Sequence, residues 1–378
     1  MPSSFSEDNG GFFGHVFPPM PPPSQFERTL IENYGDLTHC AGLISQAPIL
    51  AVDVEFVAAK ATDSSSTPRL ALIQIFDGHQ TYVIDAMKLF HLSILNEPFM
   101  NPAILKIFHG VGSDLRVLGA RDLHVQNIID IEAVCRSIFG AKESGLQSMM
   151  LRSCGYRMDK TLQRSDWTLR PLTSAMFLYA ARDAEMTYQL YLWLTEYYAD
   201  YITAFADSPY DLPIEKLAAE WLTPFLQKDR SAWIEGPQIY ISLPASIREK
   251  DFTEAYRRIQ KPVLRARLIK AAADIGLLEV KELLFASLTA LTSEERSAAV
   301  RALSKMHVNE YRNEIRALLT DPVYDVRKAA VYALKHLDES YKSEKHSAEI
   351  HEDTQPDSEE DDMSPWKAKL RGMIPPDS

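Results

Sequence analysis

The sequence is poor in cysteine, in long apolar runs and in net positive charge. Its 378 residues include three cysteines, Cys40, Cys135 and Cys154. This number excludes a disulfide framework, and no Cys-x-x-Cys pair suggests a zinc site. No stretch reaches the roughly 18 apolar residues of a membrane span, and the N-terminus lacks the basic start of a signal peptide. We therefore expect no membrane segment and an intracellular, reducing compartment: cytoplasmic by default, with the nucleus left open.

The deficit of positive charge is concentrated in one segment. The chain has 40 Lys and Arg residues against 52 Asp and Glu residues, a net charge of −12. Residues 338–362 alone carry −9, so the remainder is close to neutral. The acidic total therefore does not exclude a nucleic-acid partner, because binding depends on local patches of charge.

Composition divides the chain into five parts. Residues 1–26 are rich in Gly, Ser and Pro and are predicted to be a disordered leader. Five prolines interrupt a connecting segment at 201–254, and residues 338–378 form an acidic tail that we also predict to be disordered. The two folded domains are then expected at 27–200 and 255–337.

Short apolar strands and helices succeed one another in residues 27–200. Apolar, β-branched runs predict strands at 49–57, 69–77, 80–86, 104–110 and 127–131. Helices are predicted at 113–119, 145–155 and 173–198, the last capped by Thr173. Strands that come first, with helices interleaved later, indicate an α/β domain with a mixed sheet covered by helices.

A repeat of 31 residues runs through 255–337. Arg265, Arg296 and Arg327 share one position of the repeat, and four further positions keep small or apolar residues in the same register. This pattern predicts an all-α array of helical hairpins that resembles short HEAT repeats. The alternative is an ordinary helical bundle in which the spacing is a coincidence.

Four carboxylates occupy unusual positions. Asp53 and Glu55 lie two apart on the predicted strand 49–57, which puts both on one face of an otherwise apolar strand. Asp114 follows the strand 104–110, and Asp183 lies four residues after Tyr179 on the helix 173–198. Paired carboxylates in a buried strand repel one another unless a cation offsets the charge, and a hard divalent metal does so.

Each of these signals has an ordinary alternative. Asp53 and Glu55 fit an exposed edge strand, Asp114 fits a helix cap, and Asp183 fits an ion pair with Arg182. Tyr179 fits a core position. The alternatives lose weight when the signals are considered together, in order along the chain.

The order DxE, then HxxxxD, then YxxxD resembles the DEDD superfamily of 3′–5′ exonucleases, in the subgroup with a tyrosine in its third motif. The likeness is greatest to ribonuclease D and covers about residues 29–196, including LALIQIFDG, IFHGVGSDL and LQRSDWTLRPLT. It implies a ribonuclease H-like exonuclease domain followed here by an all-α helical-repeat domain. Ribonuclease D has HRDC-type helical domains after its nuclease, so the C-terminal part departs from that family.

The resemblance implies a metal-dependent exoribonuclease that removes nucleotides from single-stranded 3′ ends. Two divalent cations, Mg²⁺ or Mn²⁺, would be held by Asp53, Glu55, Asp114 and Asp183. Tyr179 would hold the attacking water or help to deprotonate it, and Glu55 would contact the terminal 3′ hydroxyl. RNA is preferred over DNA only through the likeness to ribonuclease D, so a Werner-type DNA exonuclease is the alternative enzyme. A non-catalytic RNA-binding scaffold, with a protein partner on the repeats, is the alternative class.

Weaker evidence points to further substrate-binding residues. Gln74 on the second predicted strand, His109 and Arg164 lie near the motifs and have structural alternatives as well. The basic run at 255–270 holds six cations and no acid, and it is predicted to be either a phosphate track or a solvated helix face. Its candidates for substrate contact are Arg257, Arg258 and Lys261.

Overall fold

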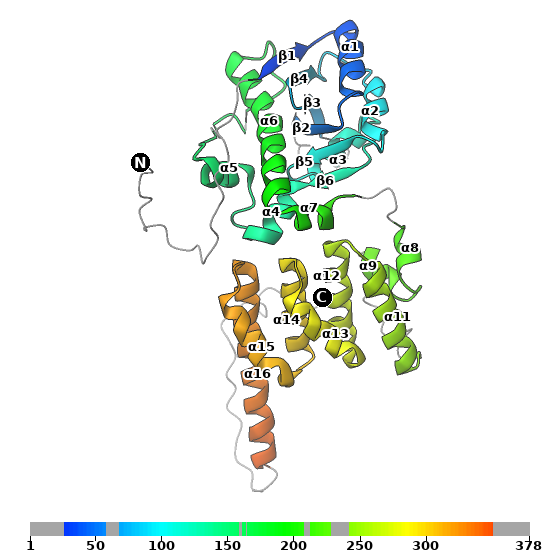
Figure 1. The fold of residues 1–378 in the computed structure, drawn as a ribbon, viewed down its shortest axis with the longest axis vertical. Helices are drawn as coiled ribbons and strands as arrows, with labels where there is room; N and C mark the ends of the chain where they lie inside the picture. Colours follow the sequence, from blue (N-terminus) through cyan, green and yellow to red (C-terminus); the bar gives the residue numbers. More distant parts are fainter. Residues whose placement is uncertain are drawn as a thin grey trace, which may run out of the picture. The chain divides into compact units, whose positions relative to one another are not determined.

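The computed structural model describes residues 26–57, 68–158, 161–163, 165–207, 212–227 and 242–350 (Figure 1). Residues 1–25 of the predicted leader, Arg164 and residues 351–378 of the predicted tail lie outside these ranges. The chain forms two compact units, of which the first ends at Leu334 and the second begins at Lys335. Among the described helices, none combines the length and the apolar character needed to span a membrane.

A mixed six-stranded sheet forms the centre of the N-terminal domain. Its strands are β1 (Glu27–Ile31), β2 (Ile49–Val57), β3 (Arg69–Phe76), β4 (Gln80–Asp85), β5 (Leu105–Phe108) and β6 (Ile128–Asp130). Their order in the sheet is β1-β4-β3-β2-β5-β6. Strand β3 is antiparallel to both of its neighbours, and the other pairs are parallel. The predicted mixed sheet is therefore confirmed.

The predicted elements agree with the structure to within two residues at their ends. The helices are α3 (Gly112–Gly119), α5 (Leu146–Cys154) and α6 (Ser174–Tyr197), with Thr173 capping α6 by accepting from the Met176 amide. Elements without a clear sequence pattern were missed: β1, α1 (Tyr34–Ile44), the short helices η1 (Ser93–Leu95) and α2 (Asn96–Met100), and α4 (Ile131–Phe139).

Helices cover both faces of the sheet (Figure 1). Buried residues of α1 and α3 pack with alternate residues of β2 and β3, such as Val52 and Ile73, on one face. On the other face, α4 and α6 pack over Ala51, Phe76 and Ile107. The free cysteines Cys40 and Cys135 are buried on these opposite faces. Because β2 contacts α6 directly, its inner face meets the helix that carries Tyr179 and Asp183.

Short helices occupy the predicted connecting segment. They are α7 (Ala199–Phe205), α8 (Ile214–Leu217), α9 (Thr223–Gln227) and α11 (Ala245–Arg258). Helix α7 contacts α4, α6 and β6, so the packed part of the N-terminal domain extends a few residues beyond the predicted boundary at residue 200.

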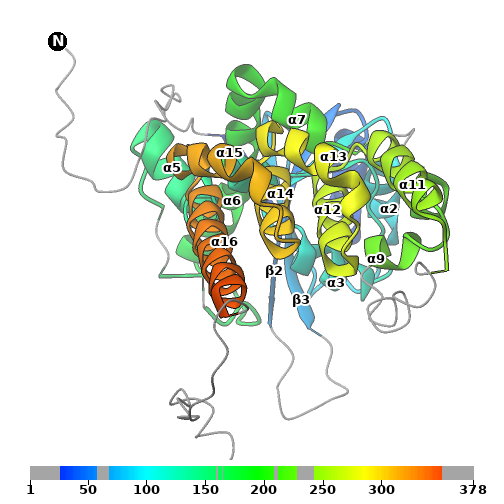
Figure 2. The same cartoon turned by 90° about the horizontal axis from the view of Figure 1, so that it is seen from below.

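The repeat is regular in the structure. Its long helices are α12 (Pro262–Ile275), α14 (Ser293–Lys305) and α16 (Tyr324–Ile350), which start 31 residues apart. Between them, η2 (Leu278–Val280), α13 (Lys281–Ala286) and η3 (Ser287–Thr289) match η4 (Asn309–Tyr311), α15 (Arg312–Ala317) and η5 (Leu318–Thr320) at the same interval. Figure 2 shows α12 and α14 side by side, with α13 and α15 in a second layer. The 31-residue helical repeat is confirmed, and its assignment to the HEAT class stays a prediction.

Helix α16 runs further than the sequence predicts. Disorder was expected from residue 338, whereas the helix continues to Ile350. No proline or glycine stands between Pro322 and Pro356, so nothing local stops the helix after Leu337, the last of its residues that is described as buried. The prediction of disorder is therefore wrong for residues 338–350.

Hydrogen bonds connect the repeats to the N-terminal domain. The Asp325 carboxylate accepts the Ala141 amide at 2.9 Å, and the Ser137 hydroxyl accepts the Ser293 amide at 3.3 Å. Lys261 donates to the Ala206 carbonyl at 2.6 Å. The first two bonds join the start of α16 and the start of α14 to the end of α4, and the third joins the residue before α12 to the end of α7.

Candidate active site

Two acidic residues share the inner face of β2. Asp53 lies opposite Gln74 of β3, and Glu55 lies opposite Leu72. A register shift between Glu55 and Phe56 interrupts the pairing with β3 directly after the second carboxylate. Such bulges turn a strand locally, and here the bulge separates Glu55 from the regular strand that follows.

Helix α6 brings a third carboxylate to this pair. One oxygen each of Asp53, Glu55 and Asp183 lies within 4.8 Å of the others. Asp114, in the first turn of α3, is buried and close enough for its charge to raise the pKa values of Asp53 and Glu55. The fold therefore brings three of the four predicted acids into one cluster, from β2 and α6. The fourth, Asp114 of α3, lies close enough to act on this cluster by its charge.

Burial and mutual repulsion make the charged form of these acids unfavourable. Burial is the main cause that raises the pKa of Glu55 to about 9, and the charges of Asp183 and Asp114 add to it. Burial likewise raises the pKa of Asp114 to about 7 and that of Asp183 to about 7. The pKa of Asp53 is raised well above its ordinary value, first by burial and then by Asp183, Glu55 and Asp114. A cation that bound here would relieve this repulsion.

Tyr179 lies one turn before Asp183 and is hydrogen-bonded to its carboxylate. Burial, and then the negative charge of Asp183, raises the pKa of the Tyr179 phenol. Its ring packs on Trp167, with 5.9 Å between the ring centroids. The phenol is therefore held neutral, as a hydrogen-bond donor at the edge of the acidic cluster.

A cavity of about 340 Å³ opens over this cluster. Asp53, Tyr179 and Asp183 line it together with His109 and Glu132. A second cavity of about 230 Å³ shares Tyr179 and Asp183 with the first and includes Arg182. Tyr179 and Asp183 thus lie between two cavities, each of which has room for part of a ligand.

Comparison with known proteins relates the N-terminal domain to a family. Residues 29–198 match the 3′–5′ exonuclease family. This part of the chain is a 3′–5′ exonuclease domain. Four of the residues described above, Asp53, Glu55, Tyr179 and Asp183, lie within the matched range on the elements that form the cavity.

Relatives of the exonuclease domain include eukaryotic and bacterial proteins. The chain is 41% identical over 123 residues to the exosome complex component 10 homolog of Caenorhabditis elegans, which is 32% of this chain and 14% of that protein. It is 32% identical over 165 residues to protein RRP6-like 3 of Arabidopsis thaliana, 43% of this chain and 18% of that one. It is 30% identical over 175 residues to ribonuclease D of a Shewanella strain, which is 45% of this chain and 44% of that protein. The matches therefore span less than half of each relative.

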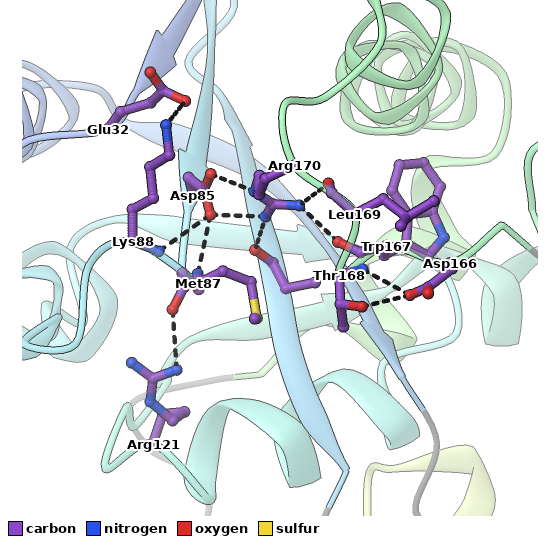
Figure 3. Close-up of polar contacts among 12 residues, drawn as sticks. Glu32, Asp85, Met87, Lys88, Arg121, Asp166, Trp167, Thr168, Leu169 and Arg170 are labelled. Atoms are coloured by element: carbon purple, nitrogen blue, oxygen red, sulfur yellow. Dashed lines mark hydrogen bonds and ion pairs between the residues drawn. The ribbon is translucent and has the colours of Figure 1, made fainter.

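A salt bridge holds the segment that carries Trp167, the residue whose ring packs on Tyr179. Arg170 donates to the buried Asp85 carboxylate from Nε at 2.5 Å and from Nη2 at 2.7 Å (Figure 3). The same guanidinium donates to the carbonyls of Trp167 and Leu169, both at 2.8 Å. Arg170 thus fastens the segment before α6 to the end of β4, and Trp167 on this segment supports Tyr179.

The weaker candidates fall into different places. The amide group of Gln74 is fully buried and lines neither cavity, and its two polar atoms have no hydrogen-bond partner among the described residues. His109 lines the cavity and its Nε2 lies 2.9 Å from the Ser144 carbonyl oxygen, in agreement with a structural role. Burial lowers the pKa of His109. Arg164 lies outside the described residues.

The basic candidates at the end of α11 lie outside both cavities. Arg258 pairs with Glu254, one turn earlier on the same helix. Lys261 pairs with Asp207 at 2.8 Å as well as with the Ala206 carbonyl. A substrate contact by Arg257, Arg258 or Lys261 stays a prediction.

The sequence did not predict two residues, one that lines the candidate site and one that supports it from behind. Glu132 lines the cavity and pairs with Arg136 at 2.8 Å. Gly110, which has φ of +87°, leaves room for it, because a Cβ there would lie 2.9 Å from the Glu132 carboxylate. Arg170 is the second. The sequence gives a signal for Asp85, the partner of Arg170, because this acid ends the apolar strand β4. It gives none for Glu132, because an acid in the first turn of a helix is common.

Proposed function

We propose that the protein is a metal-dependent 3′–5′ exoribonuclease that hydrolyses single-stranded RNA from its 3′ end. The observation that carries the proposal is the convergence of Asp53, Glu55 and Asp183, whose oxygens lie within 4.8 Å of one another. Asp53 and Asp183 also line a cavity of the exonuclease domain. Such a cluster has a high electrostatic cost without a cation, and the chain retains it at the site of its family's chemistry.

The residues present fit a divalent metal. Carboxylate oxygens are the hard ligands that Mg²⁺ and Mn²⁺ prefer. Asp53, Glu55 and Asp183 would hold the metal, with Asp114 as the fourth acid, and two ions are what the resemblance to ribonuclease D implies. When bound, the cations neutralise the charge of the scissile phosphate and favour ionisation of a water.

The chain's own groups orient the substrate and the water. The neutral phenol of Tyr179 donates a hydrogen bond, so we assign it to holding the attacking water rather than to removing its proton at neutral pH. Glu55 lies on β2 directly before the register shift, and we assign it to the terminal 3′ hydroxyl. Trp167 and Arg170 keep the tyrosine in place.

RNA is proposed over DNA because relatives named ribonuclease D and exosome component share this domain. The carboxylates themselves act on either backbone, so the structure of the cavity gives no preference of its own. A Werner-type activity on DNA is the outcome that would replace this part of the proposal.

The test is a digestion assay on oligonucleotides labelled at the 5′ end. With Mg²⁺ or Mn²⁺, single-stranded RNA should shorten stepwise from the 3′ end and release nucleoside 5′-monophosphates, and a 3′-phosphate should block the reaction. Excess chelator should stop it. A DNA oligomer of the same sequence should be cut more slowly. Cleavage that persists in chelator would overturn the metal site, and absence of any cleavage would favour a binding scaffold.

A further inference from the structure

The repeats and the exonuclease domain enclose a groove of about 580 Å³ that is separate from the catalytic cavities. Its walls come from the inner faces of α12 and α14, from α4 of the exonuclease domain and from the start of α16. Hydrogen bonds from Ser293 to Ser137 and from Ala141 to Asp325 hold these elements together.

Cations predominate around this groove. Five basic residues from three helices line it, Arg136, Arg267, Lys270, Arg301 and Lys305, against three acids. One acid, Asp325, accepts the amide of Ala141, and another, Asp274, is shared between two of the lysines. Lys270 and Lys305 keep 68% and 57% of their side chains exposed. The groove is therefore complementary to an extended anion.

Arg301 is the clearest member of this set. It is exposed, and within the described part of the chain it makes no hydrogen bond or ion pair. An arginine donates several N–H groups in a fixed fork that matches the oxygens of a phosphate. Its donors are thus available to a ligand in the groove.

The floor between the cations is apolar and made of small side chains. Val263, Ala266 and Ala298 contribute to it, and Val263 is 44% exposed. Such a floor accepts the flat, apolar faces of bases or riboses without selecting a sequence, while the cations contact the backbone. This combination suits a single strand that moves as it is shortened.

One turn of helix links the groove to the catalytic cavity. Glu132 lines the cavity, Arg136 lines the groove, and the two side chains pair at 2.8 Å on α4. Four residues along a helix correspond to about 6 Å. A strand whose 3′ end occupies the cavity therefore has the mouth of the groove beside it.

We propose that this groove binds the phosphate backbone of the single strand whose 3′ end lies in the exonuclease site. The inference rests on the proposed function. It assigns the phosphate track to the face of α12 and α14 that carries Lys270 and Arg301. Lys270 belongs to the basic run 255–270 that the sequence predicted, whereas the candidates Arg257, Arg258 and Lys261 do not line the groove.

Two variants of equal charge test the assignment. Lys270→Gln/Arg301→Gln removes two cations from the groove, and Lys250→Gln/Arg316→Gln removes two exposed cations of other helices that do not line it. On RNA of about 20 nucleotides, longer than the reach of one binding module, the groove variant should raise KM about fivefold to tenfold and change kcat less than about twofold. The control variant should stay within about twofold of the wild-type protein.

The salt dependence of binding separates this role from a structural one. In a catalytically inactive Asp53→Asn background, the slope of log K against log salt should become shallower by about 1.4 for the groove variant, since each single-strand phosphate contact contributes about 0.7. It should not change for the control. Equal slopes in both variants would overturn the proposal. The proposal would also be overturned if the groove variant bound RNA as tightly as the wild-type protein but bound an acidic peptide more weakly.

Cross-linking and short substrates complete the test. A photo-reactive amino acid at Val263, in the groove, should cross-link long RNA, whereas one at Leu278, 52% exposed and outside it, should not. Equal cross-linking at both positions would count against the groove. The wild-type protein, the groove variant and the control variant should cleave a dinucleotide at the same rate, because so short a substrate does not reach α12.

A wild-type protein that does not cleave RNA at all would contradict the proposed function. Binding and cross-linking would then still test the groove.

Discussion

Arg296 donates two hydrogen bonds to the carboxylate of Asp321, from Nε at 2.8 Å and from Nη2 at 3.1 Å. The arginine lies in α14 and the aspartate lies just before α16, so the pair joins two successive repeat units. Both side chains are nearly buried, with 10% and 4% of their area exposed. A pair of this kind is costly to break from one side, because the remaining charge stays buried.

Asp321→Ala should therefore lower the free energy of unfolding of the repeats by about 3–5 kcal/mol, as expected when one partner of a buried pair is removed. Urea denaturation followed by circular dichroism measures this. Arg316→Ala, an exposed residue of α15, is the control and should change stability by less than about 0.5 kcal/mol. A cost for Asp321→Ala that matched the control would show that the pair contributes nothing.

The sequence predicted part of this arrangement. Arg265, Arg296 and Arg327 each donate to a carbonyl six residues earlier, those of Ile259, Ala290 and Asp321. A shared backbone contact explains why arginine recurs every 31 residues. The aspartate partner had no such signal, because the equivalent positions are isoleucine and alanine. A sequence repeat thus predicts contacts that recur in every unit, such as these arginine–carbonyl bonds. It does not predict a contact that occurs once, such as the pair of Arg296 and Asp321.

Asp53→Asn should abolish nuclease activity and leave the fold intact. Loss of one group that stabilises the transition state typically costs about 10²–10³-fold in rate, and a shared metal ligand should cost at least that. Activity on 5′-labelled RNA and the circular dichroism spectrum are the two readouts. The matched control is Asp36→Asn, an exposed acid of α1, which should cleave at the wild-type rate. Wild-type activity of Asp53→Asn would remove this residue from the site.

The acidic cluster of the candidate site was predicted from the sequence more fully than the residues that support it. Asp53, Glu55 and Asp183 stood out because a carboxylate in an apolar strand or mid-helix breaks a local rule. Arg170 and Glu132 break none: an arginine after a loop and an acid in a first helical turn are ordinary. Their roles come from tertiary packing against Asp85 and Gly110, which no local pattern records.

The metal-free protein should lose stability as the pH rises. Burial raises the pKa of Asp183 to about 7 and that of Glu55 to about 9, above the values near 4 of the unfolded chain. Groups with a raised folded-state pKa stabilise the fold fully below their unfolded pKa and lose this contribution as the pH passes the folded pKa. The contribution of the cluster should thus decline between about pH 4 and pH 9.

The comparison with Asp53→Asn isolates this effect. In chelator, the variant should melt above the wild-type protein, by a margin at least about 3 °C larger at pH 8 than at pH 5, which corresponds to roughly 1 kcal/mol. Excess Mg²⁺ should reverse the order, because binding to the folded state stabilises it. A margin independent of both pH and metal would mean that the carboxylates do not repel one another.

Deleting residues 338–378 should leave melting and the chemical step unchanged. Leu337 is the last buried residue described in α16, and no site residue follows it. The deletion raises the net charge from −12 to −5, so binding of nucleic acid should be equal or tighter. Truncation before Leu337 is the contrasting variant and should destabilise the repeats. A large fall in melting temperature on deleting 338–378 alone would show that the segment is structural.

Tyr179→Phe separates the positioning of water from the binding of metal. The substitution keeps the ring that packs on Trp167 and removes only the hydroxyl that bonds to Asp183. We expect kcat to fall about 10²-fold, within the usual contribution of a positioned proton-transfer or water-holding group, with KM nearly unchanged. The rise in melting temperature on adding Mg²⁺ should stay the same as in the wild-type protein, since all four carboxylates remain. Tyr188→Phe, which removes a hydroxyl of α6 outside the catalytic cavity, is the matched control and should keep wild-type kcat. If Tyr179→Phe abolished the metal-dependent shift in melting, the phenol would be supporting the metal ligands, and if kcat did not change, the water would be held by another group.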